Sequence, residues 1–165
     1  MIKHNIGTLC LLGLVVGLLV FAGAGPSLSA SPPKATGGVG FTTTDDDGNE
    51  LKCRVEFNAH AGDPAKGKLN YRDANGGWFR VDIQCVHVLQ DSAFAFFSGP
   101  IVSASDSALV GHYLLVAVHD GGTPGKKGDR VWGEMFEDEP ECEFDYWPGD
   151  PGDDLPVESG NLVVH

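Results

Sequence analysis

The residue types that could support chemistry here are carboxylates, histidines and cysteines, but their spacing fits few known kinds of site. The acidic run that ends at Gly48 looks like the start of a calcium loop. When Gly48 takes the glycine position of the helix-loop-helix calcium motif, the first and last ligand positions fall on Thr43 and Arg54, which excludes that motif. We therefore expect no metal cofactor, and only weak, nonspecific cation binding by the carboxylates at 45–47 and 150–154.

The other catalytic motifs are incomplete. Gly62–Leu69 is close to a phosphate-binding loop, but Leu69 stands where a Ser or Thr must hold the metal, and a strand pattern follows in place of a helix. The six histidines lack the spacing of a zinc motif, and the Gly-x-Ser-x-Gly sequence of many hydrolases is missing. We therefore predict no catalytic residues and no cofactor.

The three cysteines beyond the apolar N-terminus leave one thiol unpaired. Cys142 lies among glutamates in a predicted loop, where a free thiol would be open to oxidation, so it has the greatest need of a partner. Cys85 lies beside a break in its strand pattern and is the better-placed partner. Cys53 lies on an apolar strand face, where a free thiol behaves as a small hydrophobe. Pairing of Cys53 with Cys85 is the alternative.

The first 30 residues have the order of an export signal. Lys3 precedes an uncharged, apolar stretch over residues 5–24, which ends in small residues. This order predicts a secretory signal peptide over residues 1–30, with cleavage between Ala24 and Ala30. An uncleaved membrane anchor is the alternative, because about 20 apolar residues can span a bilayer. We expect a secreted, extracellular protein whose mature form is not embedded in a membrane.

The rest of the chain is expected to form one acidic domain. A length of 165 residues fits a single domain, which we place at 35–165 after a short linker at 31–34. The chain has 11 Lys and Arg against 23 Asp and Glu, a formal net charge of −12. This balance argues against nucleic acid or an anionic membrane as partner, because both require clustered basic residues. Eleven of the carboxylates fall within 131–165.

Alternating hydrophobicity predicts strands throughout this domain. Glu50–Asn58 and Phe79–Cys85 place every second residue on an apolar side, which is the period of a half-buried strand. Turn signals at Gly48 and at Asn75–Gly77 join neighbouring strands as hairpins. After Cys85 the apolar parity changes, which predicts a bulge or a stretch buried on both faces. We therefore expect an all-β fold, a single antiparallel barrel or sandwich of about eight strands. The predicted core consists of Leu51, Val55, Phe57, Val81, Ile83, Leu114, Val116, Val118 and Val163.

Several longer motifs follow one another along the chain. They are Ala35–Gly38, Lys68–Asp73, Val118–Asp129, Gly149–Asp154 and Ser159–His165. The most specific pieces are the Asp-Gly-Gly-x-Pro-Gly turn and the Gly-Asn-Leu-Val-Val-His ending. In this order the chain resembles the post-COAP domain, a family of small exported bacterial proteins and modules, over residues 35–165.

The resemblance implies an all-β exported domain and carries no catalytic motif. It also favours a Cys85–Cys142 disulfide, since members of the family tend to carry cysteines at these two places. The chain departs from the family pattern in the Trp- and Glu-rich segment 132–147 and at Cys53.

Three functions are compatible with these features. The first is a non-catalytic exported module that binds an extracellular protein or a glycan through Trp78, Tyr146 and Trp147, which lie beside predicted turns. The second is a small-ligand carrier, because a closed eight-stranded barrel can hold one apolar molecule. Its cavity would be lined by Phe94, Phe96, Phe97, Leu114 and Val116. The third is an exported hydrolase that uses carboxylates of the acidic segment. A cavity of several hundred Å³ would favour the carrier.

Export is directly testable by mass spectrometry. Protein recovered from the medium or the periplasm should have the intact mass of a chain whose first residue lies between Gly25 and Ser31. The reason is that the apolar run ends at small residues followed by Pro and Ser. A mature chain whose mass still includes residues 1–21 would mean a membrane anchor in place of a cleaved signal.

Overall fold

The computed structural model describes residues 31–45, 47–89, 93–122, 128–144 and 154–165. The chain divides into two units, residues 1–30 and Ser31–His165, and all described residues belong to the second. Tyr146 and Trp147, two of the predicted partner-binding residues, lie outside the described residues, as do the predicted cleavage sites. Within the described part of the chain, no helix is long and apolar enough to cross a membrane.

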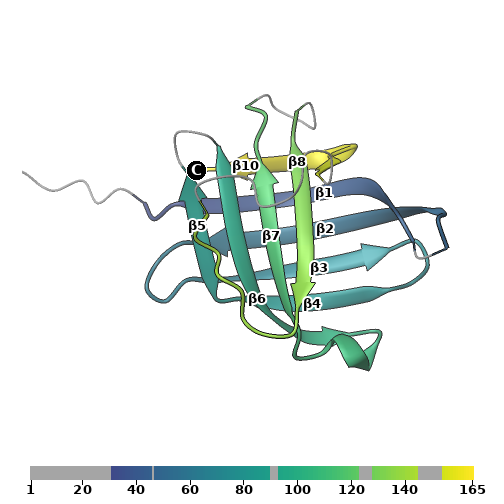
Figure 1. Ribbon diagram of the computed structural model, residues 1–165. Coiled ribbons are helices and arrows are strands. Elements are labelled where there is room, and N and C mark those ends of the chain that lie inside the picture. The colour runs from purple at the N-terminus through teal and green to yellow at the C-terminus, as the bar shows by residue number, and fades with distance from the viewer. Residues whose placement is uncertain (1–30, 46, 90–92, 123–127, 145–153) are drawn as a thin grey trace, which may run out of the picture. The chain divides into compact units, whose positions relative to one another are not determined.

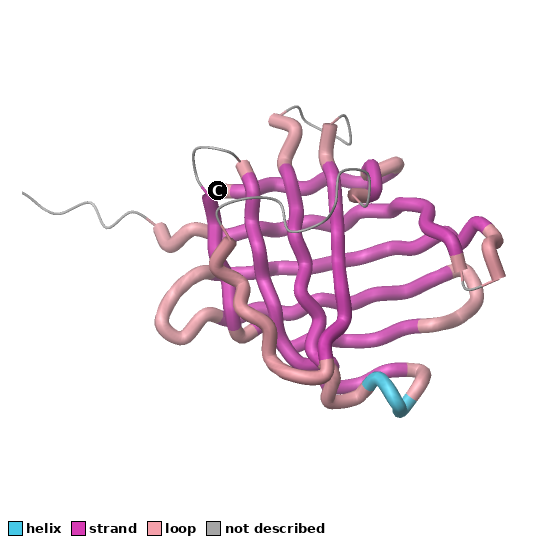
Figure 2. The backbone as a smooth tube through the Cα atoms, viewed as in Figure 1, coloured by secondary structure: helices cyan, strands magenta, loops and turns pink. Residues whose placement is uncertain are grey.

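The described domain is built almost wholly of antiparallel strands, which confirms the predicted fold class (Figures 1 and 2). Its elements are β1 (Lys34–Thr44), β2 (Glu50–His60), β3 (Lys66–Asp73), β4 (Trp78–Ile83), β5 (Cys85–Leu89), β6 (Phe94–Ala104), the 3-10 helix η2 (Ser107–Leu109), β7 (Tyr113–His119), β8 (Arg130–Phe136), β9 (Leu155–Pro156) and β10 (Ser159–Val164). The order across the sheet is β10-β1-β2-β3-β4-β6-β7-β8-β9, and β5 pairs with β6. β1 thus begins at the last residue of the predicted linker.

The hairpins form where the turn residues predict them. Gly48 and Gly76 adopt φ angles of 84° and 89°, which side-chain-bearing residues rarely adopt. Asp45 accepts hydrogen bonds from the backbone N–H groups of Asp47 and Asn49, at 3.1 and 2.8 Å. Such Asx contacts replace the ladder bonds that a turn must give up. The acidic run beside Gly48 therefore has a local structural use, in closing the β1–β2 hairpin.

The strands form two layers, and the bent strand β6 takes part in both of them. Its C-terminal residues 101–104 pair with β4, and residues 94–100 pair with β7. β4 and β5 are separated only by Gln84, and together they follow the bend of β6. The predicted parity change after Cys85 corresponds to this kink. Figure 1 shows β6, β7 and β8 crossing over β1 to β4, as expected for sheets that share a bent strand at one corner.

The opposite corner is closed by the C-terminal segment. β9 pairs with β8, and β10 pairs with β1. Between them, Val157 N–H donates to the Asp129 carbonyl at 3.0 Å and Glu158 N–H to the Gly40 carbonyl at 2.8 Å. If β4–β5 and β9–β10 are each counted as one kinked strand, eight antiparallel strands follow one another around a closed circuit of neighbours. The ten observed strands exceed the predicted number of about eight because these two strands are each interrupted, at Gln84 and at Val157–Glu158.

The core lies between the two layers and matches most of the prediction. Val55, Phe57, Val81, Ile83 and the inward side chains of β7 are buried, while Leu51 is partly exposed. Val163 was assigned to the wrong face. In β10 the buried residue is Leu162, because Leu162 and Val164 share the inward side and Val163 lies between them. The three consecutive apolar residues give no alternation from which the face could be read.

A disulfide joins Cys85 to Cys142, as the resemblance implied, and the two Cα atoms are 6.2 Å apart. The alternative pairing of Cys53 with Cys85 is wrong, because Cys53 is a free, buried thiol. Cys142 is only 1% exposed, and nearby Phe144 packs its ring against that of Phe96 at 5.6 Å. The disulfide and this ring contact hold residues 142–144 against β5 and β6.

Removal of one core ring should measure the energy of this packing. Phe57 is 6% exposed, and its ring lies 5.0 Å from that of Phe97 on the other layer. Replacing Phe57 with Ala should lower the free energy of unfolding by about 3–5 kcal/mol in denaturant titrations, because the cavity cannot fully collapse. The exposed neighbour Lys52→Ala is the control and should cost less than about 0.5 kcal/mol. A loss below about 1 kcal/mol for Phe57→Ala would contradict the assigned packing.

Candidate functional site

The barrel contains an apolar cavity at one end, which we call the cup. Its volume is about 590 Å³. Its wall comes from inward-facing side chains of β1 to β4, β7 and β8, and Leu109 and the residues before η2 contribute to the rim. The apolar wall residues are Phe41, Leu51, Val55, Leu69, Tyr71, Phe79, Leu114, Val116 and Val131.

The cup exists because the two edges of the barrel separate at this end. β8 pairs with β9 only through Arg130 and Val131, and β1 pairs with β10 only up to Gly40. The rest of β8 and residues 41–44 of β1 therefore have no described strand between them. Gly133 widens the gap further, because it follows the inward-facing Val131 by two residues and has no side chain to fill the space.

The cup wall contains one polar pair in otherwise apolar surroundings. The Cys53 sulfur lies 3.1 Å from the Tyr71 hydroxyl, and the Tyr71 ring stacks on Phe79 with centroids 4.5 Å apart. Burial raises the pKa of the Cys53 thiol, and burial together with the Cys53 contact raises the pKa of the Tyr71 hydroxyl. Both groups are therefore neutral at physiological pH. They give the cup two weak hydrogen-bonding groups and no charge on its inner wall.

The mouth of the cup is acidic. Asp45, Asp73 and Asp106 line it, and each already accepts backbone hydrogen bonds that fix a turn or the start of η2. Backbone N–H donation from Asn49 lowers the pKa of Asp45, although burial acts in the opposite direction. Among the described residues, no three histidine, cysteine or carboxylate side chains come together as metal ligands. The mouth thus carries negative charge, and its carboxylates are positioned by the turns and the start of η2 that they stabilise.

The structure brings together only part of the predicted carrier lining. Leu114 and Val116 line the cup as expected. Phe94, Phe96 and Phe97 do not line it. Phe97 packs in the core, Phe96 faces Phe144 on the outer side of the sheet, and Phe94 stacks on His119 at 4.5 Å. In a continuous apolar run no alternation shows which residues face inward, so this strand could not be oriented from sequence.

The predicted partner-binding residue Trp78 lies on the rim of the cup. It is 39% exposed at the start of β4, beside the β3–β4 turn. Cys53, Tyr71 and Gly133 were missed as site residues. The alternation of polar and apolar residues in β2 placed Cys53 on the apolar side of its strand. The same alternation in β3 places Tyr71 on the apolar side and could have identified it. Nothing local marks Gly133 as facing a cavity.

The carboxylates of residues 131–165, which the hydrolase alternative would use, lie partly outside the described residues. Among the described residues, three side chains with unpartnered buried polar atoms, Ser98, His87 and Asp129, do not form a catalytic set. Ser98 and His87 lie diagonally across the β5–β6 pair, and the side-chain atoms Ser98 Oγ and His87 Nε2 are buried without a hydrogen-bond partner. Asp129 Oδ2 is also unpartnered, but Asp129 lies at the start of β8, where its other oxygen accepts the Gly121 N–H at 3.0 Å. A Ser-His-Asp site requires direct hydrogen bonds among its members. Among the described residues, no hydrogen bond connects these three side chains.

Searches against protein-family models, curated proteins and solved structures found no match.

The protonation state of Cys53 can be tested by its reactivity. Only the thiolate reacts with a disulfide reagent, and burial raises the pKa of Cys53 above its ordinary value of 9.0. At pH 8 the folded protein should therefore react at least about tenfold more slowly than the same chain in denaturant. The Cys53→Ser variant of the chain without residues 1–30, and thus without Cys10, should show no reaction in either state. Equal rates for the folded and unfolded wild type would show that Cys53 is accessible and not perturbed.

Proposed function

We propose that this protein is a non-catalytic carrier that binds one small, apolar molecule in the cup. The observation that carries the proposal is the 590 Å³ cavity, open at one end of an otherwise packed barrel. Ligand cavities in proteins commonly measure about 300–1,000 Å³ and are mostly apolar with a few polar groups. Among the functions compatible with the sequence, the carrier is the one that accounts for such a space.

The wall of the cup also limits the chemistry of the ligand. Tyr71 and Phe79 present aromatic surface, and Cys53 and the Tyr71 hydroxyl offer hydrogen bonds without charge. An anionic group would meet Asp45, Asp73 and Asp106 at the mouth and be repelled. The expected ligand is therefore neutral or cationic, with an apolar body and one or two hydrogen-bonding atoms.

We place this activity outside the cytoplasm. The apolar N-terminus predicts export, and disulfides such as Cys85–Cys142 are typical of oxidising compartments. Membership of the post-COAP family rests on the sequence motifs alone and is part of this proposal. In this setting the cup can bind and hold a molecule that dissolves poorly in water.

Filling the cup provides the test. N-phenyl-1-naphthylamine, a neutral apolar dye, should gain fluorescence on binding the wild type. Gly133→Leu should weaken this binding at least about tenfold, since the added side chain takes space the dye needs. A Cβ at Gly133 meets its nearest neighbour, the Leu115 carbonyl oxygen, at 3.5 Å, so the variant should fold. Its melting temperature should equal or exceed that of the wild type.

A matched control separates the cup from general surface binding. Val110→Leu places the same leucine side chain at an exposed position, 47% accessible, which does not line the cup. This variant should bind the dye as the wild type does. The proposal fails if the wild type gives no fluorescence gain, or if Gly133→Leu folds normally and binds the dye with unchanged affinity.

A further inference from the structure

The outer face of β2, β3 and β4 is basic although the whole chain is acidic. Exposed basic side chains from these strands form what we call the basic face. They are Lys52, Arg54, Lys66, Lys68, Arg72 and Arg80. Six of the chain's 11 Lys and Arg residues are thus gathered on one side of three adjacent strands. The same side carries three acidic residues, Glu50, Glu56 and Asp82, so its charge is opposite in sign to the chain's net charge of −12.

The basic face contains like charges at positions where a sheet normally avoids them. Arg54 lies directly opposite Arg72 in the β2–β3 register. Directly opposed like charges destabilise a sheet, so fold stability gives no reason for this pair. Among the described residues, the ion pairs are Arg54 with Glu56, and Arg130 with Asp154, and the second lies elsewhere. Most of the positive charge of the face is therefore available to an external anion.

An aromatic ring adjoins the basic face at one end. Trp78 lies opposite Arg72 in the β3–β4 register, and the Arg80 guanidinium lies 6.0 Å from the centre of the Trp78 ring. An exposed tryptophan beside cationic groups provides a flat apolar surface and charge within reach of one ligand. Such a ring can stack on the apolar face of a sugar while the arginines meet its acidic groups.

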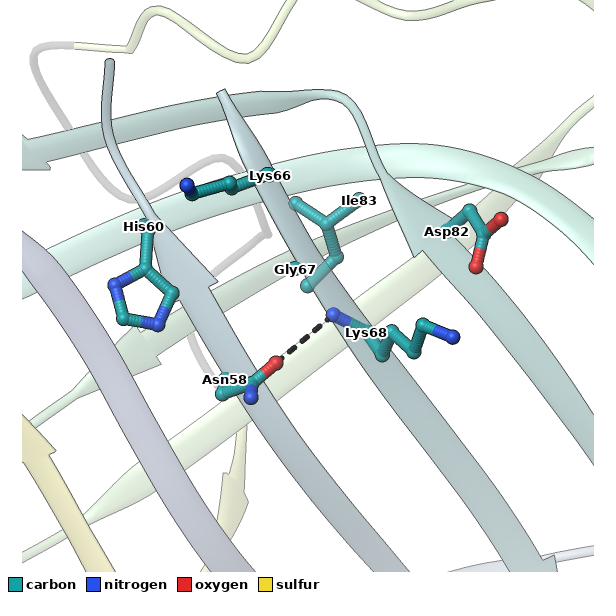
Figure 3. A pocket seen from close by; sticks show the side chains of 7 residues that line it. All are labelled: Asn58, His60, Lys66, Gly67, Lys68, Asp82 and Ile83. Atoms are coloured by element: carbon teal, nitrogen blue, oxygen red, sulfur yellow. Dashed lines mark hydrogen bonds between the residues drawn. The ribbon is translucent and has the colours of Figure 1, made fainter. Parts of the chain in front are cut away.

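The other end of the basic face is a shallow hollow, drawn in Figure 3. Lys66 and His60 are opposed across β2 and β3, and the next outward pair is Lys68 and Asn58. The Asn58 side-chain oxygen accepts the Lys68 backbone N–H at 3.0 Å, and the ion pairs of the described residues do not include the Lys68 ammonium group. From Lys66 to Arg72 the strand extends about 20 Å at about 3.3 Å per residue. A single small anion cannot span that length, but a linear polymer can.

We propose that the basic face binds a linear anionic polysaccharide, which lies along β3 and stacks one sugar on Trp78. Charge complementarity selects a polyanion, and the acidic remainder of the chain restricts it to this face. Disulfides such as Cys85–Cys142 are rare in cytosolic and nuclear proteins, where nucleic acids are found, and this favours a polysaccharide as the polyanion. This site does not depend on the proposed carrier function, since the basic side chains point away from the barrel interior, although Trp78 lies at the edge of both sites.

The test uses the oxidised, disulfide-bonded protein and heparin as the probe. Binding should weaken steeply with salt, because neutralised charges release counterions. Arg54→Gln/Arg72→Gln should weaken binding at least about tenfold at 0.1 M salt and reduce the slope of log K against log salt by roughly two. Arg54→Lys/Arg72→Lys should keep most of the affinity. Trp78→Ala should weaken binding and leave the slope unchanged, because it removes stacking and no charge.

A charge-matched control and a competitor complete the experiment. Ser107→Glu/Val110→Glu shifts the net charge by the same two units at exposed positions in and beside η2, and should leave heparin affinity within about twofold. The proposal is overturned if the wild type does not bind heparin at 50 mM salt, or if the Arg54→Gln/Arg72→Gln variant binds as tightly as the wild type. Tighter binding to single-stranded oligo-dT than to heparin would overturn it in favour of nucleic acid. Salt-sensitive self-association lost in the same variant, without heparin binding, would assign the face to a second copy of this chain.

Discussion

The fold depends on one long-range pairing, in which the C-terminal segment connects both edges of the curled sheet. Without β9 and β10, the backbone groups of β1 and β8 on that side would lack strand partners, which is unfavourable for any sheet edge. The junction is tightly built. Gly160 has a φ of 95° and approaches the Gly38 backbone so closely that no side chain would fit, and Leu162 is buried. Asp129 contributes its carbonyl to Val157.

The incompleteness of this pairing also creates the cup. Because β9 is only two residues long, it pairs with β8 only near the start of β8. Toward the end of β8 the wall of the barrel is open. Core side chains fill the joined half, and the open half keeps an apolar space with a thiol and a hydroxyl in its wall. The same circuit of strands therefore supplies both a rigid body and a cavity. Its outer surface is divided as well, with basic residues on β2 to β4, while residues 142–144, which include Glu143, lie against β5 and β6.

Sequence reasoning succeeded where residues alternate and failed where they do not. In β2 and β4 the period of two defined both faces, so the hairpins and the core residues other than Leu51 were predicted correctly. In β6 and β10 consecutive apolar residues left the facing undetermined, which misplaced Phe96 and Val163. The cup could not be foreseen, because it results from a short β9 and a missing side chain at Gly133 rather than from any local motif. The basic face was not predicted, because the net charge of the chain is a sum over all its residues and does not show where they lie. The alternation of side chains along β2 to β4 places the basic residues together on the outer side of the sheet.

The pairing of the first described strand with the last also has a consequence for how the chain folds. The backbone of Lys34 exchanges hydrogen bonds with that of His165, at 3.1 and 2.8 Å, so contacts that close the barrel join residues from opposite ends of the domain. Pairings between such distant residues form late, since the loop-closure entropy must be overcome before they contribute. During synthesis, a nascent chain lacking β10 cannot complete the circuit, and its two unsatisfied edges stay exposed. The circuit of strands therefore closes only after β10, the last strand of the domain, has been synthesised.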